Sequence, residues 1–173
     1  AEGDVEKAIE YYEKFEKETA LSTRLGEVRL AKARLLAETG RLSRARETLE
    51  AILEDQTTPA RTKAETLLRI GENLAAEGEP LKASAYFERV YVRYGKYGEL
   101  NAAAYWQRGE ALEKLGKNAE ALEVYEELVS REDLREFEQA KEAPEKVTAL
   151  EPFRRAEPEP DTEPATTVEE ENT

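Results

Sequence analysis

Apolar side chains recur every three or four residues along most of this chain, which is the spacing that places them on one face of a helix. Two such segments, expected over about residues 62–76 and 81–94, are separated by a short turn that contains Gly78. Glycine is favoured there because the residue that leaves a helix often adopts a left-handed conformation. The pattern therefore predicts a helical hairpin. Similar hairpins occur before and after it, so the sequence indicates an all-α protein.

The hairpins are copies of one another. Four stretches align at a near-constant offset, and the last three are spaced 38 residues apart. Each contains a glycine, then an alanine, then two bulky apolar residues at helical spacing. These are Gly3, Ala8, Tyr12 and Phe15; Gly40, Ala45, Leu49 and Ile52; Gly78, Ala83, Phe87 and Val90; and Gly116, Ala121, Tyr125 and Leu128. A fixed period of this length is typical of stacked-repeat proteins.

Small residues also recur in the first helix of each hairpin. Ala33, Gly71 and Gly109 occupy equivalent positions, where a small side chain lets the two helices approach closely. The second helices carry the aligned small residues Ala45, Ala83 and Ala121. We therefore expect each hairpin to pack small faces against each other.

This combination resembles the tetratricopeptide repeat, which has Gly or Ala at its eighth position, a turn near the fifteenth, Ala at the twentieth and an aromatic residue at the twenty-fourth. The matching residues are Gly71, Gly78, Ala83 and Phe87 in one copy and Gly109, Gly116, Ala121 and Tyr125 in the next. The period of 38 residues exceeds the usual length of about 34. Longer repeats of this kind are similar to those of bacterial envelope tetratricopeptide proteins, including Tol–Pal-associated and outer-membrane assembly factors. That similarity favours the periplasm or cell envelope over the cytoplasm.

The resemblance implies a right-handed superhelical solenoid of antiparallel helix pairs. We expect the second helix of a truncated repeat, three full repeats, a capping helix and a disordered acidic tail rich in Pro, Glu and Thr. Their bounds are 1–20, 21–58, 59–96, 97–131, 132–143 and 144–173. The first helix presents a packing face without its partner helix, so we expect further repeats before residue 1. The tail has too few apolar residues to offset the entropy of ordering.

Composition narrows the range of functions. The chain has no Cys and no His, which excludes thiol nucleophiles, Cys/His zinc sites and His-based triads. It has 39 acidic and 26 basic residues and a net charge of −13, and Lys and Arg are interleaved with Glu along the predicted helices. Nucleic-acid binding is therefore disfavoured. No apolar run approaches the roughly 20 residues of a membrane span, and we expect no metal or cofactor.

The first helices of a tetratricopeptide fold line a concave groove, and the resemblance implies which residues face it. The candidate ligand contacts are Leu30, Arg34, Leu68, Arg69, Glu72, Trp106, Gln107 and Glu110. Leu30, Leu68 and Trp106 lie one repeat apart and would form an apolar ridge, with Trp106 as its main anchor. The alternative is that all three are ordinary core between repeats. The Lys and Asn with which some family members grip a peptide carboxylate are absent from the matching positions.

The predicted function is a non-catalytic scaffold that binds a peptide, a helix or a partner domain on its groove during the assembly of a complex. The acidic lean of the groove favours a neutral or basic ligand, oriented by Arg34 and Arg69. Carboxylate pairs such as Glu110 and Glu113 are expected from the abundance of Glu alone, so they do not indicate catalysis. Two alternatives stay open: a structural spacer or self-association module, and the accessory helical region of a larger, possibly enzymatic protein.

Overall fold

The computed structural model describes residues 2–18 and 24–155, and every regular element in these ranges is a helix. The α-helices are α1 (Glu2–Glu18), α2 (Leu25–Glu38), α3 (Leu42–Glu54), α4 (Ala60–Ala76), α5 (Pro80–Tyr94), α6 (Gly98–Lys114), α7 (Asn118–Ser130) and α8 (Glu138–Leu150). Two short 3-10 helices, η1 (Glu132–Leu134) and η2 (Glu151–Phe153), flank α8.

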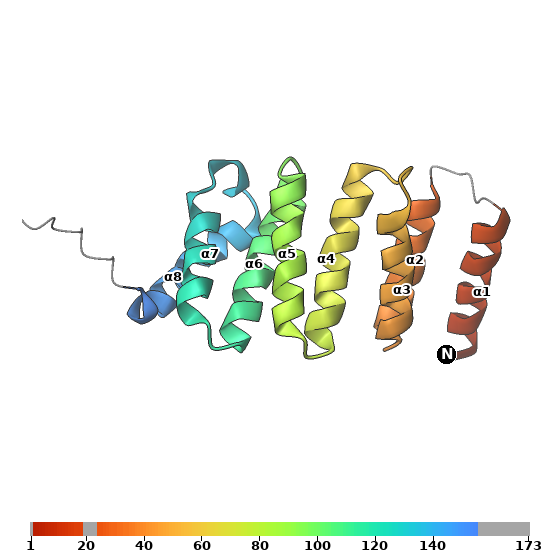
Figure 1. Cartoon of the computed structure of the whole chain (residues 1–173), viewed down its shortest axis with the longest axis horizontal. Coiled ribbons are helices and arrows are strands. Elements are labelled where there is room, and N and C mark those ends of the chain that lie inside the picture. Colours follow the sequence, from red (N-terminus) through yellow and green to blue (C-terminus); the bar gives the residue numbers. More distant parts are fainter. Residues whose placement is uncertain (1, 19–23, 156–173) are drawn as a thin grey trace, which may run out of the picture.

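The helices stand side by side in one elongated row, from α1 at one end to α8 at the other (Figure 1). Successive helices from α1 to α8 pack on each other, and α2 also contacts α4, α4 contacts α6, and α6 contacts α8. The first helices of neighbouring hairpins therefore touch along one side of the row. This arrangement confirms the prediction of an all-α solenoid built from antiparallel helix pairs.

The turns inside the three hairpins share one backbone conformation and one hydrogen-bond pattern. Gly40, Gly78 and Gly116 have φ angles of 76°, 79° and 70°, a region that side chains with a Cβ atom resist. The amide that follows each glycine donates to the carbonyl five residues earlier, which satisfies a group that the helix end would otherwise leave unpaired. These bonds join Arg41 to Leu36, Glu79 to Leu74 and Lys117 to Leu112, at 2.8, 2.9 and 3.0 Å. Gly3 differs from the other three because it lies in the first turn of α1.

The glycines of the first helices sit directly under aromatic rings of the second helices. A Cβ atom added to Gly71 would lie 2.4 Å from Cε1 of Phe87, and one added to Gly109 would lie 2.3 Å from Cζ of Tyr125. Both distances are far below van der Waals contact, so only glycine fits beneath these rings. In the first hairpin the equivalent residues are Ala33 and Leu49, both buried, where a smaller partner leaves room for the methyl group.

The C-terminal end differs from the sequence prediction. The expected capping helix over 132–143 is instead the 3-10 helix η1 followed by α8, which continues past Pro144 to Leu150. A proline inside a helix removes one hydrogen bond, but α8 keeps its helical form because Ala140, Ala143 and Leu150 are buried against the preceding helices. The predicted disorder is therefore wrong for residues 144–153, which are helical. The rest of the predicted tail, from residue 156 onward, lies outside the described residues.

At the other end, α1 packs through a different stripe from the one predicted. Ile9 is buried against Leu36 and Ala45, with Val5 beside it. The predicted packing residues Ala8, Tyr12 and Phe15 are only partly covered, and together with Lys7, Tyr11 and Val28 they line a surface pocket of about 440 Å³. Ion pairs to the neighbouring hairpin hold α1 in place, among them Lys32 with Glu16 at 2.8 Å.

Candidate functional site

Three surface pockets follow one another along the row of first helices. A pocket of about 450 Å³ between α2 and α4 is lined by Arg34, Arg69 and Glu72, among others. The next, of about 350 Å³, lies between α4 and α6 and shares Glu72 with the first. A third pocket, of about 430 Å³, lies between α6 and α8 and shares Trp106 with the second. Each pocket shares a lining residue with its neighbour, so the three lie in one row, which we call the groove.

Charged and polar side chains form a connected ladder along the groove from α2 to α6. Arg34 pairs with Glu65 at 3.3 Å, and Arg69 approaches Glu65 at 3.6 Å and Glu72 at 2.9 Å. The side-chain amide of Gln107 then donates to Glu72 at 3.1 Å. Burial opposes the charge of Arg69, but Glu72 and Glu65 outweigh it and raise the pKa of the guanidinium. Arg69 therefore keeps its positive charge, and its contacts with both carboxylates fix the polar side chains of the groove floor.

Trp106 is half-buried and lines two of the three pockets. Its ring meets Tyr125 edge-on at 5.6 Å, and the Lys146 ammonium lies 5.7 Å from the ring centre. Lys146 also pairs with Glu113 at 2.7 Å, and this carboxylate accepts a hydrogen bond from the Tyr125 hydroxyl at 2.7 Å. Burial and that hydrogen bond raise the pKa of Tyr125. Part of Trp106 thus supports packing at α8 while the rest forms groove surface.

The predicted apolar ridge does not form. Leu30 and Leu68 are only 9 % and 4 % exposed and belong to the central core, so neither is available as a ligand anchor. The reason is that the first helices of neighbouring hairpins contact one another, and leucine side chains at this position are covered in that contact. Of the three residues, Trp106 alone stays partly accessible, as is usual for so large a side chain.

The remaining candidates do gather at the groove. Arg34 is exposed, whereas Arg69, Glu72, Gln107 and Glu110 are half-buried. Glu110 lines the pocket between α4 and α6.

Asn73 also lines the groove, and the sequence prediction omitted it. It is 7 % exposed, and its Nδ2 atom has no hydrogen-bond acceptor among the described residues, as is also true of Nε of Arg69. Unpaired buried donors are uncommon because each has lost its hydrogen bonds to water. A signal was present in the repeats, since the residues 38 positions away on either side of Asn73 are the apolar Leu35 and Ala111.

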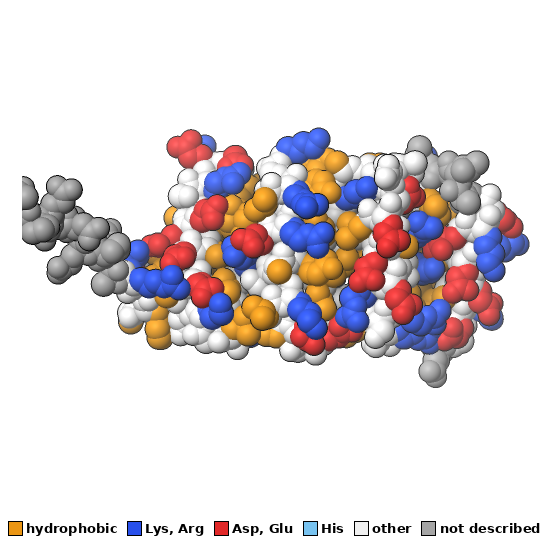
Figure 2. All heavy atoms as spheres, viewed as in Figure 1, with side chains coloured by type: hydrophobic (Ala, Val, Ile, Leu, Met, Phe, Trp, Pro, Cys, Tyr) orange, Lys and Arg blue, Asp and Glu red, His pale blue; other side chains and the backbone are white. Residues whose placement is uncertain are grey.

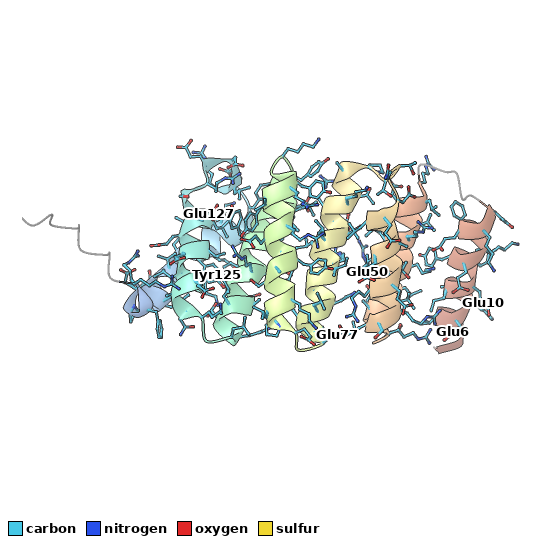
Figure 3. The ribbon with its side chains drawn as sticks, viewed as in Figure 1. Glu6, Glu10, Glu50, Glu77, Tyr125 and Glu127 are labelled. Atoms are coloured by element: carbon cyan, nitrogen blue, oxygen red, sulfur yellow. The ribbon has the colours of Figure 1, made fainter. Side chains whose placement is uncertain are left out.

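A second aromatic cluster lies at the α5–α6 packing contact and is structural. Tyr91 stacks on Tyr105 with ring centres 3.8 Å apart and an angle of 8° between the planes. Burial raises the pKa of Tyr91 to about 12, although Arg108 beside its hydroxyl opposes the shift. Glu127 on α7, seen in Figure 3, accepts a hydrogen bond from the Tyr105 hydroxyl at 2.5 Å. These contacts join α5, α6 and α7 rather than lining the groove.

The described residues contain neither a cluster of metal-binding side chains nor a helix that could span a membrane. No group of three or more Asp and Glu side chains within 2–18 and 24–155 is placed to hold a metal ion. In the same ranges, no helix combines the length and apolar character needed to cross a membrane.

Comparison with known proteins gives a consistent picture of the fold. Two models of the tetratricopeptide repeat match residues 1–68 and 68–134. Among solved structures, one described as "Crystal structure of MamA" is similar with a TM-score of 0.59 and 22% sequence identity, covering 88% of this chain and 91% of that one. At this identity the likeness shows a shared fold only. No curated protein sequence matches significantly.

Proposed function

Because the chain belongs to the tetratricopeptide repeat family, we propose that it is a non-catalytic scaffold whose groove binds a segment of a partner protein. Solenoids of this kind present extended concave surfaces, and proteins of this family are protein-interaction modules in general. The observation that carries the proposal is the groove, a row of three adjoining pockets from α2 to α8, in which Trp106 offers a partly accessible aromatic surface.

Trp106 is suited to the role of anchor. Tryptophan is enriched among the few residues that dominate binding energy, because one side chain covers a large apolar area. Here its position is fixed from two sides, by the Tyr125 ring and the Lys146 ammonium. A side chain that is already held in place loses little entropy when a ligand covers it.

The polar groups of the groove favour different ligand chemistry at its two ends. Between α2 and α4, the unpaired donors of Asn73 and Arg69 favour a ligand that brings acceptors, such as the carbonyl groups of an extended peptide. Between α6 and α8, Glu142 and Glu145 line the groove, while Lys146 is already paired with Glu113. A basic ligand side chain is therefore favoured at this end.

Replacing Trp106 with Ala tests the proposal. Partners captured from a lysate by the wild-type chain would be identified by mass spectrometry, and the affinity of the strongest would be measured by calorimetry. We expect Trp106→Ala to weaken binding by about 2 kcal/mol, roughly 30-fold in Kd, with the helical circular dichroism unchanged.

The matched control is Tyr11→Ala, which removes an aromatic side chain that is 78 % exposed on α1 and lines none of the three pockets of the groove. It should leave the affinity unchanged. Equal binding by wild type and Trp106→Ala would contradict the groove as the binding site.

Self-association is the second candidate function, and the apolar pocket on α1 is the observation that favours it. Lys7, Ala8, Tyr11, Tyr12 and Phe15 of α1 line this pocket together with Val28 of α2. If this pocket carried the function, the mass in light scattering would rise with concentration and Tyr11→Ala, rather than Trp106→Ala, would abolish the association.

A further inference from the structure

The outward face of α5 is unlike the rest of the surface. Leu81 and Val92 are 62 % and 69 % exposed, and a row of basic side chains runs beside them. The α5 stripe, as we name this surface, consists of Leu81, Lys82, Ala85, Arg89, Val92 and Arg93 of α5 and of Lys96 just after the helix ends. One exposed acidic residue, Glu88, lies on the same face between Ala85 and Val92, and it pairs with Arg108 of α6 at 3.0 Å. Figure 2 shows basic side chains in a column over α5 with apolar side chains next to it.

The repeats supply an internal comparison for this face, because the residues 38 positions before and after those of α5 lie in α3 and α7 or, as for Arg93, directly after those helices. In place of Leu81, Ala85 and Val92, α3 has Ser43, Glu47 and Glu54, and α7 has Ala119, Glu123 and Ser130. In place of Lys82, Arg89 and Arg93, the counterparts are Arg44, Ala51 and Asp55, and Glu120, Glu127 and Arg131. Hairpin packing thus accepts acidic and polar residues at these positions. The apolar and basic character of the α5 stripe calls for another explanation.

Much of the positive charge on the α5 stripe is not neutralised within the protein. Arg89, Arg93 and Lys96 form no ion pair with any described residue, whereas most other arginines in those ranges do. Arg89 lies 4.8 Å from the Tyr86 ring centre, and Lys96 lies 5.1 Å from that of Tyr97. Lys82, by contrast, pairs with Glu79 at 3.2 Å.

Acidic residues gather at the lower end of α5. Glu77, seen at the foot of the hairpin in Figure 3, pairs with Arg46 there. The positive field is therefore strongest over the half of the α5 stripe from Arg89 to Lys96.

The chain itself contains a ligand of matching charge. Residues 156–173 include seven carboxylates and no basic residue. The acidic residues are Glu157, Glu159, Asp161, Glu163, Glu169, Glu170 and Glu171. We propose that this acidic segment binds the α5 stripe of its own chain. The groove lies on the row of first helices, so this inference does not depend on the proposed function.

The segment starts close enough to reach the α5 stripe. The described chain ends on α7, where Arg154 pairs with Glu126 at 2.5 Å and Arg155 approaches Glu120 and Glu123 at 3.7 Å. Only α6 separates α7 from α5 in the order of packing. Packed helices are about 8–10 Å apart, so the crossing is on the order of 20 Å. Eighteen residues span up to about 60 Å when extended, which covers this distance and the length of α5.

Charge directs the segment to α5 rather than to nearer surfaces. The outward face of α7 carries Glu120, Glu123, Glu126 and Glu127, and Arg154 and Arg155 already pair with three of them. Like charges therefore disfavour binding on α7 itself. A short tether gives the segment an effective concentration on the order of mM at the α5 stripe, so a weak electrostatic interaction suffices. An acidic partner protein would have to displace it.

Paramagnetic relaxation in the full chain tests this contact. The protein has no Cys, so Thr167→Cys gives a single site for a nitroxide label. At low ionic strength we expect the amide NMR signals of residues 85–97 to lose intensity more than those of the equivalent residues 47–59. In about 1 M NaCl, where the Debye length is about 3 Å, the difference should disappear.

Two sets of charge changes separate the proposal from non-specific attraction. The selective loss of signal intensity at residues 85–97 should disappear in a triple variant with Arg89→Glu, Arg93→Glu and Lys96→Glu. It should persist in a control variant that makes the same change in net charge on α1, with Lys7→Glu, Lys14→Glu and Lys17→Glu. If the first set unfolds the chain, Glu169→Gln, Glu170→Gln and Glu171→Gln test the same contact from the segment, where folding of the helices is not at stake.

Three results would overturn the proposal. The first is that the amide signals of residues 85–97 lose no more intensity at low ionic strength than those of residues 47–59. The second is that the loss persists in the variants with altered charge on α5 or on the segment. The third is that a mixture of isotope-labelled chains without nitroxide and unlabelled chains with nitroxide shows the full effect, because the segment would then be binding a second copy.

Discussion

At the scale of single residues, the three hairpins keep similar the combined volume of two facing side chains, one from each helix, although the residue types differ. Gly71 faces Phe87 and Gly109 faces Tyr125, whereas the first hairpin combines the larger Ala33 with the smaller Leu49. Protein interiors are close-packed, so an extra methyl group on one side requires a smaller side chain on the other. The three hairpins therefore show two solutions to one packing problem within a single chain.

The two solutions should be exchangeable. We expect Gly71→Ala alone to lower the free energy of unfolding by about 1–3 kcal/mol, because its Cβ atom would lie 2.4 Å from the Phe87 ring. Phe87→Leu should make room for the methyl group. The double variant, measured by urea denaturation, should be more stable than the sum of the single effects by at least about 0.5 kcal/mol. Strict additivity would show that the ring and the methyl group do not compete for space.

Residue-scale packing also explains what the sequence could predict about the site. The polar candidates Arg34, Arg69 and Glu72 were predictable because their place in the helical period points them away from the core. The exposure of Leu30 and Leu68 could not be predicted, since it depends on how closely neighbouring hairpins approach each other.

At the scale of elements, the turn glycines made three hairpins predictable, whereas the full length of α8 was not. The feature that relates α8 to the first helices of the hairpins is a leucine that recurs at intervals of 38 residues and is buried in each copy. The four residues are Leu36, Leu74, Leu112 and Leu150. Pro144 obscured this period because proline usually marks the end of a helix. Burial against α7 outweighs that local preference in α8, and such a tertiary effect is not visible in local sequence.

The proline in α8 should therefore reduce the stability of the helix that contains it. Pro144 is the seventh residue of α8, so it lacks the amide that would donate to the carbonyl of Ala140. We expect Pro144→Ala to raise the free energy of unfolding by about 1–3 kcal/mol, because Pro is roughly 3 kcal/mol less favourable than Ala inside a helix. Urea denaturation would measure the gain.

Pro152→Ala is the matched control, since Pro152 lies near the start of the 3-10 helix η2, where a proline replaces no helical bond. A stability gain of the same size from both substitutions would mean that the helical hydrogen bond in α8 is not the cause.

At the scale of the whole molecule, the two ends of the row are covered differently. At the C-terminal end, α8 buries one side on α7 and α6, and its outward residues are largely polar. At the other end, α1 contacts mainly α2 and contributes Ile9 to a small separate cluster. The largest core spans α2 to α6. Stability in a solenoid is approximately a sum over neighbouring units, so it should be unevenly distributed along the row.

Native-state hydrogen exchange should reveal this gradient. We expect amides of α1 to exchange through local opening, with free energies well below that of global unfolding, because few buried contacts must break. Amides of α4, α5 and α6 should exchange only with global unfolding, since these helices hold most of the central core. Ile9→Ala should then accelerate exchange in α1 and leave α5 unchanged, whereas Val90→Ala should accelerate exchange in α4, α5 and α6 together. If Ile9→Ala lowered protection along the entire row, the chain would open as one cooperative unit and its ends would have no independent stability.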